Sequence, residues 1–302
     1  MIKPKLVVMA AGLGSRYGGL KQMEAVTAEG EIILDFAVYD AMRAGFEDVV
    51  FIIKPEMEAV FKERVMDPIS KYMNTQYVFQ DISQLPDGFE VPEGRVKPWG
   101  TCHAVMACRD ILDGPFAVIN SDDYYGSDAF KKVWDFLIND KADDTYCMAG
   151  YYIEKTLSEQ GTVTRGVCEN DGQGNLTRIN ETKEIGIYDG IIGYPDENGH
   201  IISIPEGTVV SMNFWGFKPS MLETMINGFP EFLRKTIKEN PLKGEYLLPI
   251  EVGRLLDEGR INVKVLEAND KWYGVTYKED KDLVTDAFKK MKESGKYPKK
   301  LW

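Results

Sequence analysis

The sequence predicts an α/β fold: a Rossmann-like, mostly parallel mixed sheet flanked by helices, in a single large domain. In the first 145 residues, short apolar segments rich in Val, Ile and Leu alternate with longer amphipathic segments. Parallel strands alternate in this way with the helices that connect them. The chain has 302 residues and is 44% hydrophobic, so one full-sized core can form. No internal repeat, low-complexity tract or Ser/Gly linker divides it, and residues 1–302 are expected to form one domain.

The first half of the chain supplies the parallel strands. The apolar run that begins at Leu6 is too short for a helix and rich enough in Val and Leu for a buried strand. Asp35 and Thr101 are the expected N-caps of two helices, because their side-chain oxygens can accept backbone N–H groups. Residues 81–98, rich in proline and glycine, are expected to be a loop. Further strands are expected at 49–53, 76–80 and 116–120, and helices at 35–45, 56–65, 101–112 and 127–138.

The second half of the chain has a more mixed pattern. Residues 219–238 are mainly helical, with a predicted break at Gly228-Phe229-Pro230, because proline removes a helical hydrogen bond. Asn170-Asp171-Gly172 is a hairpin-type turn. Strands are expected at 146–154, 162–169, 176–180 and 209–217, and helices at 249–258 and 280–293.

The composition argues against several classes of function. A formal net charge of −12 disfavours non-specific binding to nucleic acid or to an anionic membrane, although a pocket can still be locally basic. No apolar run approaches the roughly 20 residues that span a bilayer. The opening residues lead into the first strand, and we expect no signal peptide. The four cysteines lack zinc-type spacing, so we expect reduced core thiols in a cytoplasmic protein: Cys102, Cys108, Cys147 and Cys168.

A glycine-rich loop follows the first strand and carries two cations. Its glycines let the backbone turn sharply and approach a ligand, so that consecutive N–H groups can surround a polyphosphate. Arg16 offers a planar fork for phosphate oxygens, and Lys21 offers a mobile point charge. The glycines of the loop are Gly12, Gly14, Gly18 and Gly19.

Three other interpretations of this loop are weaker. A dinucleotide-binding fingerprint needs G-x-G-x-x-G and an acidic residue about 20 positions later, and here the third glycine, Gly18, is one place late. A P-loop needs G-x-x-x-x-G-K-[ST], which Gly19-Leu20-Lys21-Gln22 fails. An ordinary turn seldom needs four glycines and two cations. The loop therefore favours a nucleotide phosphate site.

Residues 10–22 resemble the opening of the sugar-1-phosphate nucleotidyltransferases, the NDP-sugar pyrophosphorylases, whose signature is roughly A-G-G/A-x-G-x-R followed by P-K. Leu20-Lys21 stands where the family usually has Pro-Lys. The resemblance implies the nucleotide-diphospho-sugar transferase type of fold. It implies that residues 1–145 bind the NTP, and that residues 146–302, with the C-terminal helices, bind the acceptor. It also implies catalytic roles for Arg16 and Lys21, and nucleotide contacts from Ala10, Ala11, Gly12, Gly14 and Ser15.

A second match lies at residues 97–105, which resemble the family's P-x-G-T-A-x-A segment with Cys102 at the alanine. The amides of a helix N-terminus and a glycine can approach the edge of a planar base. The resemblance implies nucleotide contacts from Gly100 and Thr101. It also implies a contact from Gln80, at the place of a base-contacting glutamine that the family has upstream. Taken alone, the segment also fits an ordinary capped helix, and His103 fits a packing residue.

A third match lies at residues 117–126, where a buried strand delivers two carboxylates at its C-terminal end. Open α/β sheets bind ligands at this edge. The family has a Mg²⁺-binding G-D here, and Asp122 is the implied ligand, with Asp123 as the alternative ligand or a neighbour; carboxylates suit Mg²⁺. Without a metal, the pair would cap the next helix. Asn213 lies where the family has its second metal ligand, although a buried Asn can also serve a structural partner.

The implied acceptor site comes from the second half of the chain. Residues 179–183 resemble the family's E-K-P segment, with Thr182 inserted and the proline missing. The resemblance implies that Glu181 contacts the sugar, and that Lys183 contacts the sugar's phosphate and has a catalytic role. Taken alone, Glu and Lys residues at a strand end are usually solvated. Residues 244–249 and 272–280 are similar to the E-Y-x-L and W-x-D-V-G-T-P-E-D segments, and Glu245 is a further implied acceptor contact.

Together, these matches imply Mg²⁺-dependent transfer of a nucleotidyl group from an NTP to a sugar 1-phosphate, giving an NDP-sugar and pyrophosphate. The alternatives are transfer to a non-sugar phosphate such as phosphocholine and a non-catalytic nucleotide sensor; a Rossmann oxidoreductase is more distant. The expected partners are an NTP and a phosphorylated small molecule, with neither nucleic acid nor membrane. Short chains of this family are often homo-oligomers, and that expectation extends to this chain. The base and the acceptor are left open.

Overall fold

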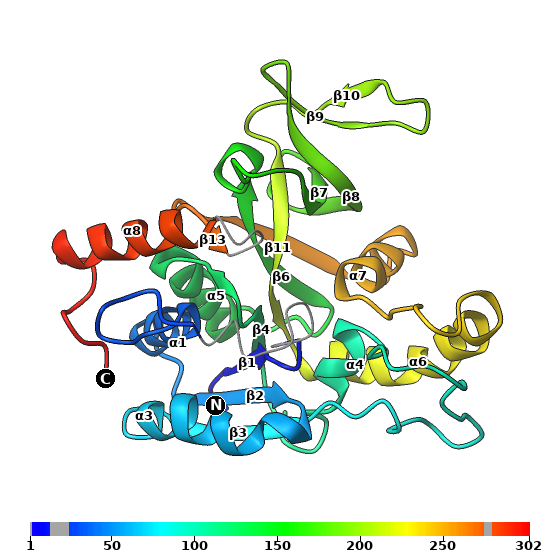
Figure 1. Cartoon of the computed structure of the whole chain (residues 1–302). Coiled ribbons are helices and arrows are strands. Elements are labelled where there is room, and N and C mark those ends of the chain that lie inside the picture. Colours follow the sequence, from blue (N-terminus) through cyan, green and yellow to red (C-terminus); the bar gives the residue numbers. More distant parts are fainter. Residues whose placement is uncertain (1, 13–23, 275–279) are drawn as a thin grey trace.

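The computed structural model of the chain describes residues 2–12, 24–274 and 280–302. Its main feature is an eleven-stranded mixed sheet with the order β10-β9-β8-β7-β11-β4-β1-β2-β3, in which β6 pairs with β11 and β12 pairs with β6. Figure 1 shows this sheet running through the middle of the molecule, with helices on either side. The chain therefore has the α/β architecture that the sequence predicts.

The first half of the chain forms the parallel part of the sheet. Val7 on the innermost strand pairs with Val50 on one side and Val118 on the other. Three of these strands are almost fully buried, as parallel strands are when helices cover both faces of the sheet. The strands are β1 (Lys5–Met9), β2 (Asp48–Ile53), β3 (Asn74–Phe79) and β4 (Phe116–Asn120).

The second half continues the sheet mainly with antiparallel strands. One strand of this half, β11, pairs antiparallel with β4, β6 and β7. The strands β8, β9 and β10 follow β7 as antiparallel neighbours, and β9 and β10 lie at the top of Figure 1. The bounds are β6 (Thr145–Tyr152), β7 (Val163–Asn170), β8 (Leu176–Tyr188), β9 (Ile191–Pro195), β10 (Ile201–Ser203), β11 (Val209–Phe217) and β12 (Asn262–Glu267).

A separate two-stranded sheet joins β5 (Asp123–Tyr124) to β13 (Tyr273–Gly274). Gly274 pairs with Asp123 in this sheet. The pairing places β13, from late in the chain, beside the residues that follow β4.

Helices cover both faces of the main sheet and bury two cores. One core lies under α1 and α5 and includes Val8 and Phe51; the other lies under α4, α6 and α7 and includes Val7 and Ile52. A smaller cluster joins α1 to α8 through Phe36 and Phe288. The bounds are α1 (Ile33–Ala44), α4 (Thr101–Met106), α5 (Ser127–Asn139), α6 (Pro219–Glu239), α7 (Leu248–Asp257) and α8 (Asp280–Glu293).

The helix expected at 56–65 is a series of short helical segments. A 3₁₀ turn, η2 (Pro55–Met57), leads into α2 (Glu58–Phe61), and a π-helical turn, η3 (Lys62–Met66), leads into α3 (Asp67–Ile69). Another 3₁₀ turn, η4 (Ile153–Lys155), follows β6.

Both predicted N-caps are wrong by one or more positions. Asp35 lies in the first turn of α1, and its Oδ2 accepts the N–H of Ile32, the residue that precedes the helix, at 2.8 Å. Thr101 is the first residue of α4, which ends at Met106 and not at residue 112. Its hydroxyl accepts the N–H of Leu248 at 2.8 Å, so it serves the start of α7.

Two other elements also differ from expectation. The predicted break in 219–238 is absent, because α6 continues through Pro230 while Phe229 and Leu233 on its inner face stay buried. A proline removes one hydrogen bond, and packing of the adjacent turns can hold such a helix together. β8 runs on to Tyr188, well past the predicted end at residue 180, and the sequence analysis did not predict β9, β10, β12 or β13.

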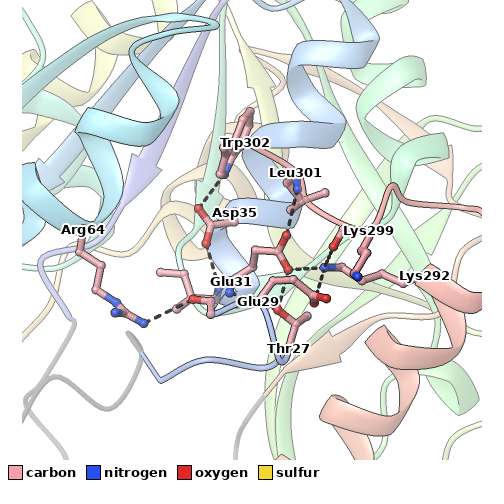
Figure 2. Close-up of polar contacts among 11 residues, drawn as sticks. Thr27, Glu29, Glu31, Asp35, Arg64, Lys292, Lys299, Leu301 and Trp302 are labelled. Atoms are coloured by element: carbon pink, nitrogen blue, oxygen red, sulfur yellow. Dashed lines mark hydrogen bonds and ion pairs between the residues drawn. The ribbon is translucent and has the colours of Figure 1, made fainter.

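The C-terminal residues bind back onto the start of α1, as Figure 2 shows. The N–H of Leu301 donates to Glu31 Oε1 at 2.9 Å, and the indole N–H of Trp302 donates to Asp35 Oδ1 at 3.0 Å. Lys292 on α8 forms an ion pair with Glu31. We call Lys292, Leu301 and Trp302 the C-terminal anchor.

Two expectations from composition can be compared with the described residues. No helix among them is long and apolar enough to cross a membrane. The four cysteines are buried and form no disulfide, as expected for core thiols.

Candidate active site

A cavity of about 490 Å³ lies where β4, β7, β8 and β11 meet. Four residues that the sequence analysis assigned to binding line it, although they are far apart in the chain: Thr101, Asp122, Glu181 and Asn213. The parallel strand β4 ends here, at the edge of the sheet where open α/β sheets bind ligands. The fold therefore brings parts of the predicted nucleotide, metal and acceptor sites to one place.

The predicted phosphate loop is described only at its beginning. Ala10 and Ala11 are buried directly after β1, and the N–H of Ala10 donates to Ile52 O at 2.8 Å. Gly12 is the last described residue before the gap. Gly14, Ser15, Arg16 and Lys21 lie outside the described residues.

The two aspartates after β4 have different surroundings. Asp123 is buried, and its Oδ2 accepts Asn120 Nδ2 at 2.8 Å and lies 3.1 Å from the hydroxyl of Tyr125. Burial and the neighbouring Asp122 raise the pKa of Asp123 to about 7, against the effect of these hydrogen bonds. Asp122 lines the cavity. The end of β4 therefore places two carboxyl groups side by side at the cavity.

Asn213 belongs to the same polar network. It lies in a bulge of β11, where the pairing with β6 shifts between Ser211 and Trp215, and its φ of 63° is in the left-handed region. Its Nδ2 donates to Asn120 Oδ1 at 2.9 Å, and its Oδ1 accepts the indole N–H of Trp215 at 2.9 Å. Asn213 thus has the structural partners that a buried Asn needs.

The donor set at the end of β4 fits Mg²⁺. Mg²⁺ is commonly held by one or two carboxylates, with water and substrate phosphates completing the shell. Asp122 and Asp123 provide those carboxylates. A cation there would oppose the effects of burial and of the neighbouring Asp122, which together raise the pKa of Asp123. Within the described ranges, no group of three or more His, Cys, Asp or Glu side chains is arranged to hold a metal.

The predicted base-binding segment is closely packed. Gln80 Nε2 donates to Gly100 O at 3.1 Å, so the long loop between these residues does not separate them. Gly100 has a φ of 103°, and a Cβ there would lie 2.5 Å from the backbone oxygen of Tyr246. This contact by itself requires glycine. His103 is buried and packs against Phe229, as expected for a packing residue.

The predicted acceptor residues are spread over a wider area. Glu181 lines the cavity, whereas Lys183 is exposed on β8 and is not among the lining residues. Lys183 lies next to Glu184, whose φ of 55° marks an irregular stretch of the pairing with β7. Glu245 forms an ion pair with Lys97 and does not line the cavity.

Two residues that line the cavity had no predicted role: Arg165 on β7, and Trp272, which begins the matched segment 272–280 and lies just before β13. Arg165 is buried, and burial lowers its pKa to about 10, while the nearby Asp123 and Glu181 favour its charged form. Its guanidinium carbon lies 4.7 Å from the centre of the Trp272 ring. In the sequence, Arg165 could be noticed as the single charged residue among the apolar and small residues of 163–168.

Comparisons with known proteins identify a matching family and similar folds. The model of a protein family described as nucleotidyl transferase matches residues 5–231. The inositol-1-phosphate CTP transferase from T. maritima has a similar structure, with a TM-score of 0.64, 12% identity, and coverage of 96% of this chain and 97% of that one. No protein of curated function is similar enough in sequence to match.

Two further solved structures are similar over most of their length. A putative glucose-1-phosphate thymidylyltransferase from Bacillus anthracis gives a TM-score of 0.62 at 14% identity, covering 94% of each chain. UDP-glucose pyrophosphorylase in complex with UDP-glucose gives a TM-score of 0.57 at 16% identity, covering 96% of this chain and 99% of the other. At these identities the structures show that the fold is shared.

Proposed function

Because the chain belongs to the nucleotidyl transferase family and is therefore a nucleotidyltransferase, we propose that it transfers a nucleotidyl group from an NTP to a sugar 1-phosphate, with Mg²⁺ bound. The products would be an NDP-sugar and pyrophosphate. One observation carries the proposal: Thr101, Asp122 and Glu181, which come from three separate predicted subsites, line one cavity.

The reaction needs positioning and charge neutralisation more than a base. An oxygen of the acceptor phosphate, already an anion, attacks the α-phosphorus of the NTP, and the bond from that phosphorus to the bridging oxygen of pyrophosphate breaks. Holding two anions in line supplies much of the rate enhancement. When bound, Mg²⁺ would neutralise charge on the phosphates. Asp122 and Asn213 are proposed to hold it, with Asp123 as the alternative carboxylate, to which Asn213 is linked through Asn120.

The remaining roles divide between the two halves of the chain. In residues 1–145, the first loop with Arg16 and Lys21 is proposed to bind the triphosphate, and Gln80, Gly100 and Thr101 to lie beside the base. In residues 146–302, Glu181 is proposed to bind a hydroxyl of the acceptor, and Lys183 its phosphate. Glu245 is proposed as a further acceptor contact. It forms an ion pair with Lys97 and does not line the cavity.

Release of pyrophosphate tests the proposal directly. Purified full-length protein with Mg²⁺ is assayed against the common NTPs and a panel of sugar 1-phosphates. Asp122→Asn should lower the rate by on the order of 10²–10³, as expected when a charge-stabilising contact is lost. Asp87→Asn, at an exposed loop position, is the matched control and should retain the wild-type rate. Activity of Asp122→Asn within a few-fold of wild type would exclude its assignment to the metal site.

A second candidate is transfer to a non-sugar phosphate. The observation that favours it is the similarity over 96% of the chain to an enzyme whose acceptor is inositol 1-phosphate. The same assay separates the two candidates when the panel includes inositol 1-phosphate and phosphocholine. If an NTP raises the melting temperature but no acceptor releases pyrophosphate, the remaining candidate is a nucleotide sensor.

A further inference from the structure

Arg165 is a buried cation that has no carboxylate partner among the described residues. It is 8% exposed, and its guanidinium donates to the backbone carbonyls of Thr164, at 2.8 Å, and Thr156. Asp123 and Glu181 act on it electrostatically, but neither forms an ion pair with it. A guanidinium removed from water is unfavourable unless its charge and its N–H groups are satisfied.

Trp272 covers Arg165 and has an unpaired donor of its own. Its indole ring lies against the guanidinium and is 7% exposed. The Nε1–H of Trp272 and the Nε–H of Arg165 are both buried, and neither has a hydrogen-bond partner among the described residues. Both residues line the cavity beside Asp122 and Glu181. One cavity wall therefore has a cation and two N–H donors that the described chain leaves unsatisfied.

These groups suit an oxyanion. Guanidinium groups bind carboxylates and phosphates through charge-assisted hydrogen bonds. The proposed function already assigns the reacting phosphate of the acceptor to Lys183 on β8. Arg165 lies on the adjacent strand, in register with Thr182. It lines the cavity together with Glu181, whereas Lys183 does not.

We propose, on the basis of the proposed transfer, that the acceptor carries an oxyanion besides its reacting phosphate, and that Arg165 and Trp272 bind that oxyanion. The group would be a carboxylate or a second phosphate. This makes Arg165 a residue that determines specificity, because an acceptor without the second anion leaves the buried cation unsatisfied.

Arg95 provides a matched structural comparison. It is also buried, its guanidinium lies 3.4 Å from the centre of the Trp99 ring, and its Nε also lacks a partner. Its other nitrogens donate to the carbonyls of Pro241, Pro98 and Gly244. Arg95 does not line the cavity. A substitution there should therefore change stability without changing acceptor selectivity.

The test compares kcat/KM for glucose 1-phosphate, glucuronic acid 1-phosphate and glucose 1,6-bisphosphate, and for analogues that carry the second anion at other ring positions. Binding of each acceptor alone is measured by calorimetry.

Wild type should prefer one anionic acceptor, and the carboxylate and bisphosphate arms identify which anion. Arg165→Gln should lower kcat/KM and affinity for that acceptor by on the order of 10²-fold more than it lowers the values for glucose 1-phosphate. Arg165→Lys should recover part of the loss, and Arg95→Lys should keep the wild-type selectivity.

The outcomes separate this proposal from the proposed function. Equal losses for all acceptors in Arg165→Gln, or a wild-type preference for glucose 1-phosphate, would assign Arg165 a structural role and overturn the inference. If no acceptor reacts but an anionic one binds in an Arg165-dependent way, the inference holds and the proposed transfer fails. If no acceptor reacts and none binds through Arg165, both fail.

Discussion

The side chain of Asp40, on α1, is buried. Its Oδ2 accepts the hydroxyl of Tyr297 at 2.6 Å, while its Oδ1 has no hydrogen-bond partner among the described residues. Burial raises the pKa of Asp40 to about 7, although the nearby Lys296 and Arg43 oppose the rise and Asp270 adds to it. Asp40 therefore stays protonated in the folded protein at pH values where the unfolded chain is ionised.

The pKa of Asp40 predicts how stability varies with pH. Its contribution to the free energy of unfolding is fully present below the unfolded pKa of 3.8 and is lost as the pH rises through about 7. The loss is up to about 4 kcal/mol, from 1.36 kcal/mol per pKa unit. Asp40→Asn should remove this dependence, so the difference in unfolding free energy between wild type and variant should change by that amount between pH 4 and 8.

Denaturant unfolding at several pH values measures this difference. Asp257→Asn, at an exposed position near the end of α7, is the control and should follow the wild-type curve. Parallel curves for wild type and Asp40→Asn would show that Asp40 is ionised in the folded state.

At the scale of elements, the start of α4 depends on the backbone of a distant segment. The N–H of Tyr246 donates to Trp99 O at 2.6 Å, and the N–H of Cys102 donates to Tyr246 O at 2.9 Å. Gly100 lies between these two bonds, where a Cβ would meet the Tyr246 backbone. The segment that leads into α7 is thereby held against the predicted base-binding segment.

Gly100→Ala should therefore lower the free energy of unfolding by about 2–4 kcal/mol, combining a left-handed backbone with overpacking against a backbone that cannot easily move. Gly88→Ala isolates the first effect, because Gly88 also has a positive φ, of 83°, but nothing lies within 4 Å of a Cβ there. Gly88→Ala should lower the free energy of unfolding by about 1–2 kcal/mol. Equal losses for the two variants in denaturant unfolding would contradict the contact with Tyr246.

How far the sequence predicts an element depends on where that element lies. The elements β4, β11 and α8 have the predicted bounds, because buried apolar runs and strong helical periodicity leave a clear pattern. β10 is exposed along its length, and β12 is only partly buried, so their patterns are weak. The caps at Asp35 and Thr101 failed because their oxygens serve other backbone groups, which short-range rules cannot identify.

The candidate site was predictable where a motif sits at a strand end. Asp122 follows the end of β4 and Glu181 follows the predicted end of a strand at residue 180, and both line the cavity. Arg165 was missed because its meaning depends on Trp272, which is more than 100 residues away and approaches through the pairing of β13 with β5. Lys183 and Glu245 do not line the cavity, and their assignments remain predictions.

At the scale of the whole molecule, the C-terminal anchor joins the end of the chain to the start of α1. The indole of Trp302 packs against Tyr39 and Tyr72, with ring centres 5.6 and 5.4 Å apart. Its N–H bonds to Asp35, whose other oxygen organises the first turn of α1 (Figure 2). α1 follows residues 24–32, which lead out of the predicted phosphate loop. The anchor thus supports the segment between that loop and the first helix.

Trp302→Ala should lower the free energy of unfolding by about 2–3 kcal/mol, because ring contacts and a hydrogen bond are lost together. Trp302→Phe retains an aromatic ring and removes the N–H, so its loss should be about 1 kcal/mol. Hydrogen exchange at residues 32–35 should accelerate in the alanine variant. Unchanged unfolding and exchange in Trp302→Ala would mean that the anchor contributes nothing to α1.

The C-terminal anchor also has a consequence for the order of folding. The bonds from Leu301 to Glu31 and from Trp302 to Asp35 join residues 270 and 267 positions apart. Contacts of such long range carry a large loop-closure entropy unless the intervening chain is already compact. The beginning of α1 should therefore reach its final state after the sheet has assembled. In a refolding experiment, protection of Ile32 should lag behind that of β1 and β4, although Ile32 precedes β4 in the chain.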